Sequence, residues 1–189
     1  MARLYLVRHG EPEAAWGGAD DNPGLSDAGR AQAIAAAQVL LEQRAATIIS
    51  SPMRRCRETA APYAELLGAK TQIERRVSEV PTPVGVADRR AWLQSNFPWR
   101  TDEARSWSTL EPALLRWRDD MLAWAHARDA DAAVFTHFIA INVLVSAALG
   151  RDATIVCRPN YASITELEAT PGAIRLVRHG AEMQAGELR

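Results

Sequence analysis

The sequence predicts an α/β fold of three layers, in which helices cover both faces of a mostly parallel central sheet. Short, almost continuous apolar runs alternate along the chain with segments whose apolar residues recur at helical spacing. Continuous apolar runs are typical of strands that are buried on both faces of a parallel sheet. The chain has 189 residues, which suits a single domain with a substantial core.

Six segments are predicted to be strands because they are short and rich in apolar residues. The run Leu4-Tyr5-Leu6-Val7 is nearly continuous in its apolar character, whereas the segment from Ser163 to Leu167 alternates between polar and apolar residues. The predicted strands are Leu4–Val7, Thr47–Ile49, Thr71–Ile73, Ala132–Phe135, Ser163–Leu167 and Ile174–Val177.

The predicted helices have recognisable ends. Ser26 is a suitable N-cap for the first helix, which carries one apolar stripe. In the second helix we expect Ser51 as the N-cap, Pro52 at the first helical position and Gly68 after the end. Two further helices are predicted from Leu110 to Trp124 and from Ile139 to Leu149.

Residues 80–110 differ in character from the rest of the chain. They contain three prolines and three tryptophans, Trp92, Trp99 and Trp107, with little regular spacing. We interpret this stretch as a small, partly helical cap inserted into one domain that spans residues 1–189. Substrate specificity is expected to depend on this cap and on the loop over residues 12–24.

The composition argues against several classes of function. The formal net charge of −1 shows no basic excess that would favour nucleic acid. No apolar run is long enough to span a membrane, and the N-terminal apolar stretch is too short for a signal peptide. The two cysteines, Cys56 and Cys157, form neither a disulfide framework nor a C-x-x-C metal motif. We therefore expect a cytoplasmic protein with no nucleic-acid or membrane partner, no cofactor and no metal; the sequence leaves the oligomeric state open.

Side chains that carry or can accept a positive charge follow three of the predicted strands. Arg8 and His9 come directly after the first strand, Arg55 follows the second, and His137 follows the fourth. Ligands of open α/β sheets bind beyond the carboxyl ends of the strands. We therefore expect these side chains to meet at one edge of the sheet, where Glu79 adds a carboxylate.

These residue types together fit one kind of reaction. Arginines bind phosphate through planar, charge-assisted hydrogen bonds, and a neutral imidazole can attack phosphorus. A carboxylic acid can protonate the leaving oxygen and then activate water. Phosphoryl transfer depends mainly on positioning and on charge stabilisation. The set therefore predicts hydrolysis of a phosphate monoester without a metal.

Five motifs follow one another in a characteristic order. They are Leu6-Val7-Arg8-His9-Gly10-Glu11, Leu25-Ser26-Asp27-Ala28-Gly29-Arg30-Ala31-Gln32-Ala33, Ser51-Pro52-Met53-Arg54-Arg55-Cys56-Arg57-Glu58-Thr59-Ala60, Glu79 with Gly85, and Thr136-His137. This series resembles the histidine phosphatase superfamily, the group that contains cofactor-dependent phosphoglycerate mutases and many small phosphatases. The resemblance covers most of the chain outside the cap.

The resemblance implies a role for each of the residues that follow the strands. His9 would be the nucleophile that becomes phosphorylated. Arg8, Arg55 and His137 would bracket the phosphate. Glu79 would act first as the acid and then as the base, and the substrate would be a small phosphorylated metabolite.

Two further residues are expected near the edge of the site. Within the pair Arg54-Arg55, the resemblance favours Arg55 as the phosphate ligand because it precedes a small residue, Cys56. Arg54 is then a possible substrate contact. Asn160 precedes the strand that begins at Ser163, and it is the second possible contact.

Two features depart from a simple match. Phe138 follows the second histidine at a position where the family usually has glycine, and it adds bulk where the backbone would approach the phosphate. The tripeptide Arg-His-Gly occurs again at Arg178-His179-Gly180, where we expect no chemical role for His179.

Two alternatives to a phosphatase stay open. One is a mutase of the phosphoglycerate type, and the other, which Phe138 suggests, is a non-catalytic phosphate-binding relative. The shortness of the chain favours the phosphatase over the mutase.

Overall fold

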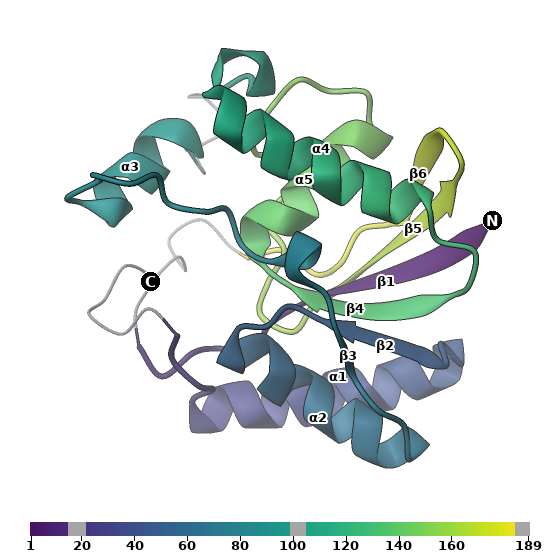
Figure 1. Ribbon diagram of the computed structural model, residues 1–189. Helices are drawn as coiled ribbons and strands as arrows, with labels where there is room; N and C mark the ends of the chain where they lie inside the picture. Colours follow the sequence, from purple (N-terminus) through teal and green to yellow (C-terminus); the bar gives the residue numbers. More distant parts are fainter. Residues whose placement is uncertain (15–21, 99–104, 184–189) are drawn as a thin grey trace.

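The computed structural model describes residues 1–14, 22–98 and 105–183, and its six-stranded sheet has the strand order β3-β2-β4-β1-β5-β6. Figure 1 shows this sheet between two layers of helices. The strands are β1 (Ala2–Arg8), β2 (Thr47–Ser50), β3 (Gln72–Ile73), β4 (Ala132–Thr136), β5 (Ile164–Thr170) and β6 (Ala173–Arg178).

The direction of the strands confirms the predicted α/β fold with a mostly parallel sheet. Strands β1, β2, β3 and β4 all run parallel to their neighbours within this group, whereas β5 is antiparallel to both β1 and β6. Arg8 at the end of β1 is in register with Thr136 of β4, and Ser50 of β2 is in register with Phe135. The carboxyl ends of β1, β2 and β4 therefore meet at one edge of the sheet.

Two helices cover each face of the sheet (Figure 1). On one face lie α1 (Asp27–Gln43) and α2 (Arg54–Leu67), and on the other lie α4 (Pro112–His126) and α5 (Phe138–Ala148). Strand β1 serves both layers, because successive side chains of a strand point to opposite faces. Leu4 and Leu6 belong to the core beneath α4 and α5, while Tyr5 and Val7 belong to the core beneath α1 and α2.

Two of the predicted helix ends are confirmed. The hydroxyl of Ser26 caps α1 by accepting a hydrogen bond from the Gly29 N–H at 3.0 Å. Gly68 ends α2 with a left-handed φ of 58°. A residue without a side chain adopts this conformation at little cost.

The predicted start of α2 is wrong. The helix begins at Arg54 rather than at Pro52, and its N-cap position is Met53. The Ser51 hydroxyl lies 2.8 Å from Nε2 of His137, so this serine contacts the second histidine instead of capping the helix in the predicted way. A short turn from Ser51 to Met53 therefore separates β2 from α2.

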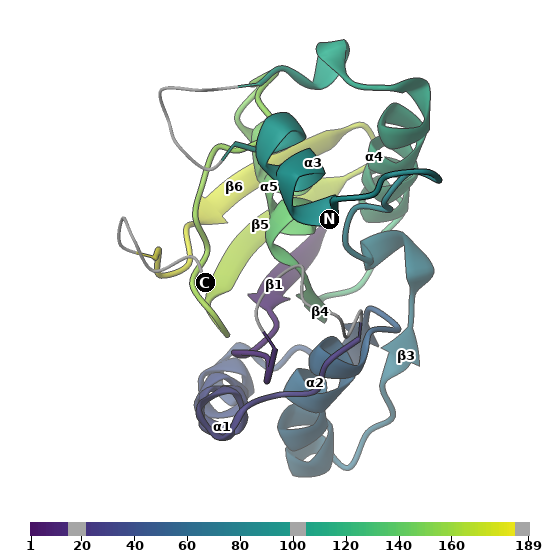
Figure 2. The same cartoon turned by 90° about the vertical axis from the view of Figure 1, so that its left-hand side faces the viewer.

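The described part of the predicted cap contains α3 (Arg89–Asn96) and the 3₁₀ helix η3 (Trp107–Thr109), while the 3₁₀ helix η1 (Arg75–Val77) precedes it. Phe97 and Trp107 are buried with their rings 5.8 Å apart, and they join the core beneath α4 and α5. Figures 1 and 2 place α3 on the side of the molecule where β1 and β4 end. Trp99 and part of the loop 12–24 lie outside the described residues.

In the described parts of the chain, every helix is too short or too polar to cross a membrane.

Candidate active site

His9 follows β1 directly and is almost completely buried, with 6% of its surface exposed. Its backbone N–H donates to the Thr136 carbonyl at 2.9 Å, which ties it to the end of β4. The ring Nδ1 lies 2.8 Å from the Gly10 carbonyl oxygen. A carbonyl oxygen only accepts hydrogen bonds, so we assign the proton to Nδ1 and the lone pair to Nε2. Burial, with Arg55 and Arg8 next in importance, holds the pKa of His9 well below its usual value of 6.5.

The loop after His9 packs tightly against α1. The Gly10 N–H donates to the Thr59 hydroxyl of α2 at 2.9 Å. A Cβ atom at Gly10 would lie 2.6 Å from the Gly29 carbonyl oxygen, and one at Gly29 would lie 2.1 Å from the Glu11 carbonyl oxygen. The side-chain oxygen of Gln32 accepts the Glu11 N–H at 2.8 Å. The Gly29 and Gln32 positions of the second motif thus hold the backbone beside the first histidine.

His137 follows β4 and is completely buried. Its Nδ1 lies 3.2 Å from Nη2 of Arg55, and its Nε2 lies 2.8 Å from the Ser51 hydroxyl. A guanidinium only donates, so we infer that Nδ1 accepts and that Nε2–H donates to Ser51. Burial is the main reason why the pKa of His137 lies well below its usual value, and Arg55 adds to it. The rings of His137 and His9 lie edge to face with centroids 5.3 Å apart.

Arg55 stands in the first turn of α2 and is buried although it is charged. The next residue, Cys56, is small enough to pack beneath the His137 ring, with its Sγ 3.3 Å from Nε2. Burial raises the pKa of the Cys56 thiol to about 12, so it is a neutral packing group at physiological pH. The structure therefore brings Arg55 and His137 together at the edge of the sheet where both were expected from their positions after the strands.

Arg8 is held by neutral groups. Its Nη1 donates to the Pro159 carbonyl at 3.0 Å, and its guanidinium lies 4.0 Å from the ring centre of Tyr161. Its Nε finds no hydrogen-bond partner among the described residues. The ion pairs found among the described residues involve neither Arg8 nor Arg55. Among the described residues, the carboxylate whose charge acts on Arg8 is that of Glu79, which forms no ion pair with either arginine.

Two aromatic side chains border Arg8. Phe138 is 3% exposed, belongs to the core beneath α4 and α5, and has its ring centre 5.2 Å from the Arg8 guanidinium carbon. Its bulk therefore fills the core. The sequence analysis did not single out Tyr161, whose ring centre also lies 5.9 Å from that of His9. Tyr161 lies shortly before β5, the strand that pairs with β1, and it is this pairing that brings it to Arg8.

Glu79 lies between η1 and the described part of the cap, and it is partly exposed. Its Oε1 accepts the Val80 N–H at 3.0 Å, and its Oε2 accepts the Ile139 N–H in the first turn of α5 at 3.4 Å. Burial raises the pKa of this carboxyl above its usual value, although the Val80 hydrogen bond and Arg55 oppose the rise. A raised pKa keeps a larger fraction of the carboxyl protonated, which suits a general acid.

The arrangement just described can be compared with that of known proteins. The family model of the histidine phosphatase superfamily, branch 1, matches residues 4–182 of the chain. The chain belongs to this superfamily. The resemblance predicted from the motifs is thereby confirmed, and so is the enzyme class, because the relatives of this histidine phosphatase include several proteins that are named phosphatases.

The similar proteins differ in how much of their length the chain covers. A probable phosphatase of Schizosaccharomyces pombe is 32% identical over 152 residues, which are 75% of this chain and 71% of that protein. The glucosyl-3-phosphoglycerate phosphatase of Mycolicibacterium vanbaalenii is 38% identical over 128 residues, which are 66% of this chain but only 51% of that protein. Two further relatives are named probable phosphoglycerate mutases.

Among solved structures, a mycobacterial glucosyl-3-phosphoglycerate phosphatase in complex with VO3 superimposes with a TM-score of 0.70. The two sequences are 22% identical, and the superposition covers 96% of this chain and all of that one. At this level of identity the superposition establishes the shared fold.

The two possible substrate contacts of this histidine phosphatase are held by other parts of the chain. Arg54 is exposed, and its Nε donates to Glu58 at 2.6 Å. A Cβ atom at Gly24 would lie 2.8 Å from the Arg54 guanidinium carbon, so Arg54 joins α2 to the loop before α1. Asn160 shapes the turn before β5, because its Oδ1 accepts the Tyr161 N–H at 2.8 Å and its backbone carbonyl accepts the Ser163 N–H.

One group of described residues has the composition of a metal site. The ligand atoms of Cys157, His179 and Glu182 lie within 4.8 Å of one another. Cys157 is buried and its thiol donates to Asn142 at 3.5 Å, whereas His179 and Glu182 are exposed. The group includes none of the residues that surround His9. It therefore does not belong to the arrangement that would bind a phosphate.

Proposed function

We propose that this histidine phosphatase hydrolyses a small phosphorylated metabolite through a phosphohistidine intermediate on His9. One observation carries the proposal: the His9 ring is buried and neutral, with Nδ1 bound to a carbonyl oxygen and Nε2 left for attack. A neutral imidazole is a nucleophile, whereas an imidazolium ion is not. The charges of Arg8 and Arg55 both act on this ring, and they supply the electrostatic attraction for a phosphate dianion.

In the first step, Nε2 of His9 attacks phosphorus while the bond from phosphorus to the ester oxygen breaks. Protonated Glu79 gives its proton to the departing oxygen, so the product leaves as a neutral alcohol. The Gly10 carbonyl oxygen accepts Nδ1–H and stabilises the positive charge that develops on the ring.

In the second step, the Glu79 carboxylate takes a proton from a water molecule. The water oxygen bonds to phosphorus as the bond to Nε2 breaks, and inorganic phosphate leaves. Glu79 is then protonated and His9 is neutral, as at the start. The raised pKa of Glu79, which burial causes, suits a group that alternates between acid and base.

Arg8 and Arg55 would stabilise the charge on the equatorial oxygens of the transferred group in both steps. His137 would border the phosphate and hold Arg55 in place through its Nδ1, which lies 3.2 Å from that guanidinium. None of these steps requires a metal ion. A cytoplasmic location stays a prediction from the sequence.

A phosphoglycerate-type mutase is the second candidate, because two of the relatives are named probable mutases. A mutase would return the phosphoryl group to the bound product instead of to water. A non-catalytic phosphate-binding protein is the third candidate, and the unusual Phe138 suggested it. Since the Phe138 side chain packs in the core, that residue does not argue for a loss of activity.

The experiment that tests the proposal is mass spectrometry of the protein, quenched without acid during turnover of p-nitrophenyl phosphate. We expect an acid-labile phosphate on His9 that is absent from His9→Ala. Release of inorganic phosphate from enzyme incubated with 3-phosphoglycerate would support the phosphatase, whereas formation of 2-phosphoglycerate would support the mutase. Tight binding of vanadate without turnover of a broad panel of phosphomonoesters would overturn the proposal in favour of the binding protein.

A further inference from the structure

Cys157, His179 and Glu182 come from two segments that meet at one end of the β5–β6 pair. Cys157 lies in the loop before β5, whereas His179 and Glu182 follow β6. Because β5 and β6 run antiparallel, with Glu166 in register with Arg178, the start of β5 and the end of β6 lie side by side. The sulfur, a ring nitrogen and a carboxylate oxygen of the three residues lie within 4.8 Å of one another. The group therefore joins two parts of the chain that are distant in the sequence.

Main-chain hydrogen bonds hold these two segments together. The Asn160 N–H donates to the Ala181 carbonyl at 2.8 Å, and the Met183 N–H donates to the Arg158 carbonyl at 2.8 Å. The two segments thus form a short antiparallel bridge. The main chain, rather than the rotamers of exposed side chains, brings the three residues together.

Cys157 is the fixed member of the group because it is buried. Oδ1 of the buried Asn142 accepts the Cys157 N–H at 3.0 Å and the Val156 N–H at 2.7 Å, and the Cys157 thiol points to the same oxygen at 3.5 Å. Asn142 is itself held in α5, where its Nδ2 donates to the Phe138 carbonyl at 3.0 Å. A buried amide whose hydrogen bonds are made is a rigid support. The sulfur is therefore in place before any ligand arrives.

His179 and Glu182 are exposed and can adjust to a ligand. The His179 ring forms no hydrogen bond with the described residues. The Glu182 carboxylate accepts the Arg158 N–H at 3.3 Å, and the ion pairs found in the described parts of the chain do not include it. Tetrahedral bonds of about 2.0–2.3 Å to a metal would set neighbouring ligand atoms about 3.3–3.8 Å apart. Small rotations of the two exposed side chains reach this geometry.

The three ligand types select the metal. Zn²⁺ binds thiolate, imidazole and carboxylate in tetrahedral sites, whereas Ca²⁺ and Mg²⁺ prefer oxygen ligands alone. We propose that Cys157, His179 and Glu182 bind Zn²⁺, with water at the fourth position, in a structural site that fastens the segment after β6 to the loop before β5. The sulfur binds as a thiolate and its proton passes to the solvent. The sequence predicted no metal, because these ligands lie in separate segments without a C-x-x-C pair.

The same two segments hold Arg8. Its Nη1 donates to the Pro159 carbonyl at 3.0 Å and lies 2.9 Å from the sulfur of Met183. Pro159 and Met183 are close in sequence to Cys157 and Glu182, so a bound Zn²⁺ restrains both supports of the arginine. The ion touches none of the reacting atoms in this proposal. It stabilises the surroundings of Arg8, and the reaction itself proceeds without it.

The first test uses Co²⁺ as a spectroscopic probe. Protein stripped with a chelator and then freed of it should gain a near-ultraviolet charge-transfer band from thiolate to Co²⁺. Zn²⁺ should bleach this band, because it binds such sites more tightly than Co²⁺ does. The band should be lost in Cys157→Ser. His179→Asn and Glu182→Gln should lower the Zn²⁺ affinity by at least about 100-fold, since loss of a mere outer-shell partner costs about 10- to 100-fold.

Thermal denaturation gives the second readout. At a free Zn²⁺ concentration of about 100 times Kd, the Tm of the wild type should rise by about 5–10 °C. The rise should disappear in His179→Asn and in Glu182→Gln. These two variants alter only exposed side chains, so they decide the matter even if Cys157→Ser fails to fold.

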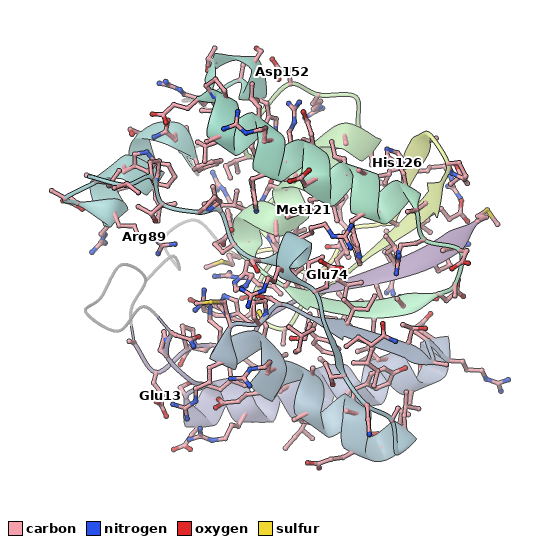
Figure 3. All side chains as sticks on the ribbon, in the orientation of Figure 1. Glu13, Glu74, Arg89, Met121, His126 and Asp152 are labelled. Carbon is pink, nitrogen blue, oxygen red and sulfur yellow. The ribbon has the colours of Figure 1, made fainter. Side chains whose placement is uncertain are left out.

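Two variants serve as matched controls. Cys56→Ser removes the other thiol, whose sulfur lies 3.3 Å from Nε2 of His137. His126→Asn removes a histidine that Figure 3 shows at the end of α4, where its Nδ1 lies 3.0 Å from the Thr170 carbonyl oxygen at the far end of β5. Both controls should keep the band and the rise in Tm.

Three outcomes would overturn the zinc site. One is a wild type that shows neither the Co²⁺ band nor a rise in Tm with Zn²⁺. Another is a band that vanishes in Cys56→Ser and survives in Cys157→Ser, which would place the metal beside His137 instead. The third is a rise in Tm that persists in both His179→Asn and Glu182→Gln.

Discussion

The chain contains the tripeptide Arg-His-Gly twice, as Arg8-His9-Gly10 and as Arg178-His179-Gly180. In both copies the arginine is the last residue of a strand and the histidine follows it. The two strands also run in the same direction, because β5 is antiparallel to both β1 and β6. Yet His9 is 6% exposed, whereas His179 lies on the surface.

The difference arises from the place of each strand in the sheet. Strand β1 lies between β4 and β5, so the loop after it is surrounded by the ends of other elements, whereas β6 is an edge strand. Around His9 the fold collects Arg55 and His137 from distant parts of the sequence. Arg178 has a carboxylate of Glu166 at 3.6 Å, whereas the ion pairs found in the described parts of the chain do not include Arg8. The same three residues therefore acquire different chemistry from their surroundings.

The largest contrast is expected at the two histidines. His9→Ala should lower turnover of p-nitrophenyl phosphate by at least about a thousandfold, because removing the nucleophile of a covalent mechanism removes the reaction path. His179→Ala should leave kcat and KM unchanged. Steady-state kinetics on both purified variants measures the contrast, and circular dichroism checks that each is folded. Substantial residual activity in His9→Ala would refute the assignment of the nucleophile.

Substitutions of Arg8 and Arg178 should also differ in their effect on activity, but by less than the substitutions of the two histidines. Arg8→Gln is expected to reduce kcat/KM by about 10²- to 10³-fold, the range typical of losing one donor that stabilises transition-state charge. Arg178→Gln removes only a partly exposed pair with Glu166, and such pairs contribute little. Vanadate affinity gives a second readout, since it should weaken in the first variant alone. Equal effects of the two substitutions would contradict the role of Arg8.

Substitution of Gly10 should lower the stability of the fold more than substitution of Gly180. A Cβ atom at Gly10 would lie 2.6 Å from a backbone oxygen of α1, whereas the nearest atoms at Gly180 lie 3.1 Å away. We expect Gly10→Ala to lower the free energy of unfolding by about 1–3 kcal/mol, as overpacking commonly does, and Gly180→Ala to lower it less. Urea denaturation of both variants measures the two values. A larger loss in Gly180→Ala would show that the α1 contact is not the tighter one.

The smallest effect concerns pH and stability. Burial is the main reason why the pKa of His9 and that of His137 lie below 6.5 in the folded protein. Below pH 6.5 the unfolded chain therefore binds protons that the folded protein does not, and the free energy of unfolding falls as the pH is lowered. Each histidine adds a slope of at most about 1.4 kcal/mol per pH unit.

His9→Asn should reduce this slope, because it removes one of the two groups, whereas His179→Asn should preserve it. Urea denaturation at intervals between pH 7 and pH 5 measures the slopes of the three proteins. An unchanged slope in His9→Asn would mean that this ring titrates in the folded protein as it does in the unfolded chain.

Most of the sheet could be predicted from local patterns. The apolar run at Leu4–Val7 is long enough to identify a buried strand, and it is found within β1. The start of α2 could not be predicted in the same way. Ser51 and Pro52 have the local features of a helix start, but Ser51 contacts His137, which is 86 residues away in the sequence. Local propensity does not describe a contact of this kind.

The same limit applies to residues around the site. Tyr161 lies against Arg8 only because β5 pairs with β1, so no pattern near residue 161 indicated its position. Phe138 was expected to add bulk at the phosphate, whereas its side chain is buried in the core beneath α5.

The sequence alone determined the class of fold, the family and the residues with the necessary chemistry, because strand and helix periods and ordered motifs are local properties. Only the tertiary structure decided which histidine is buried beside Arg8 and Arg55, and which one is exposed. The protonation of His9 and the surroundings of Arg8 depend on burial and on neighbours that are distant in the chain. Such neighbours are brought together by strand order, which a linear sequence does not display.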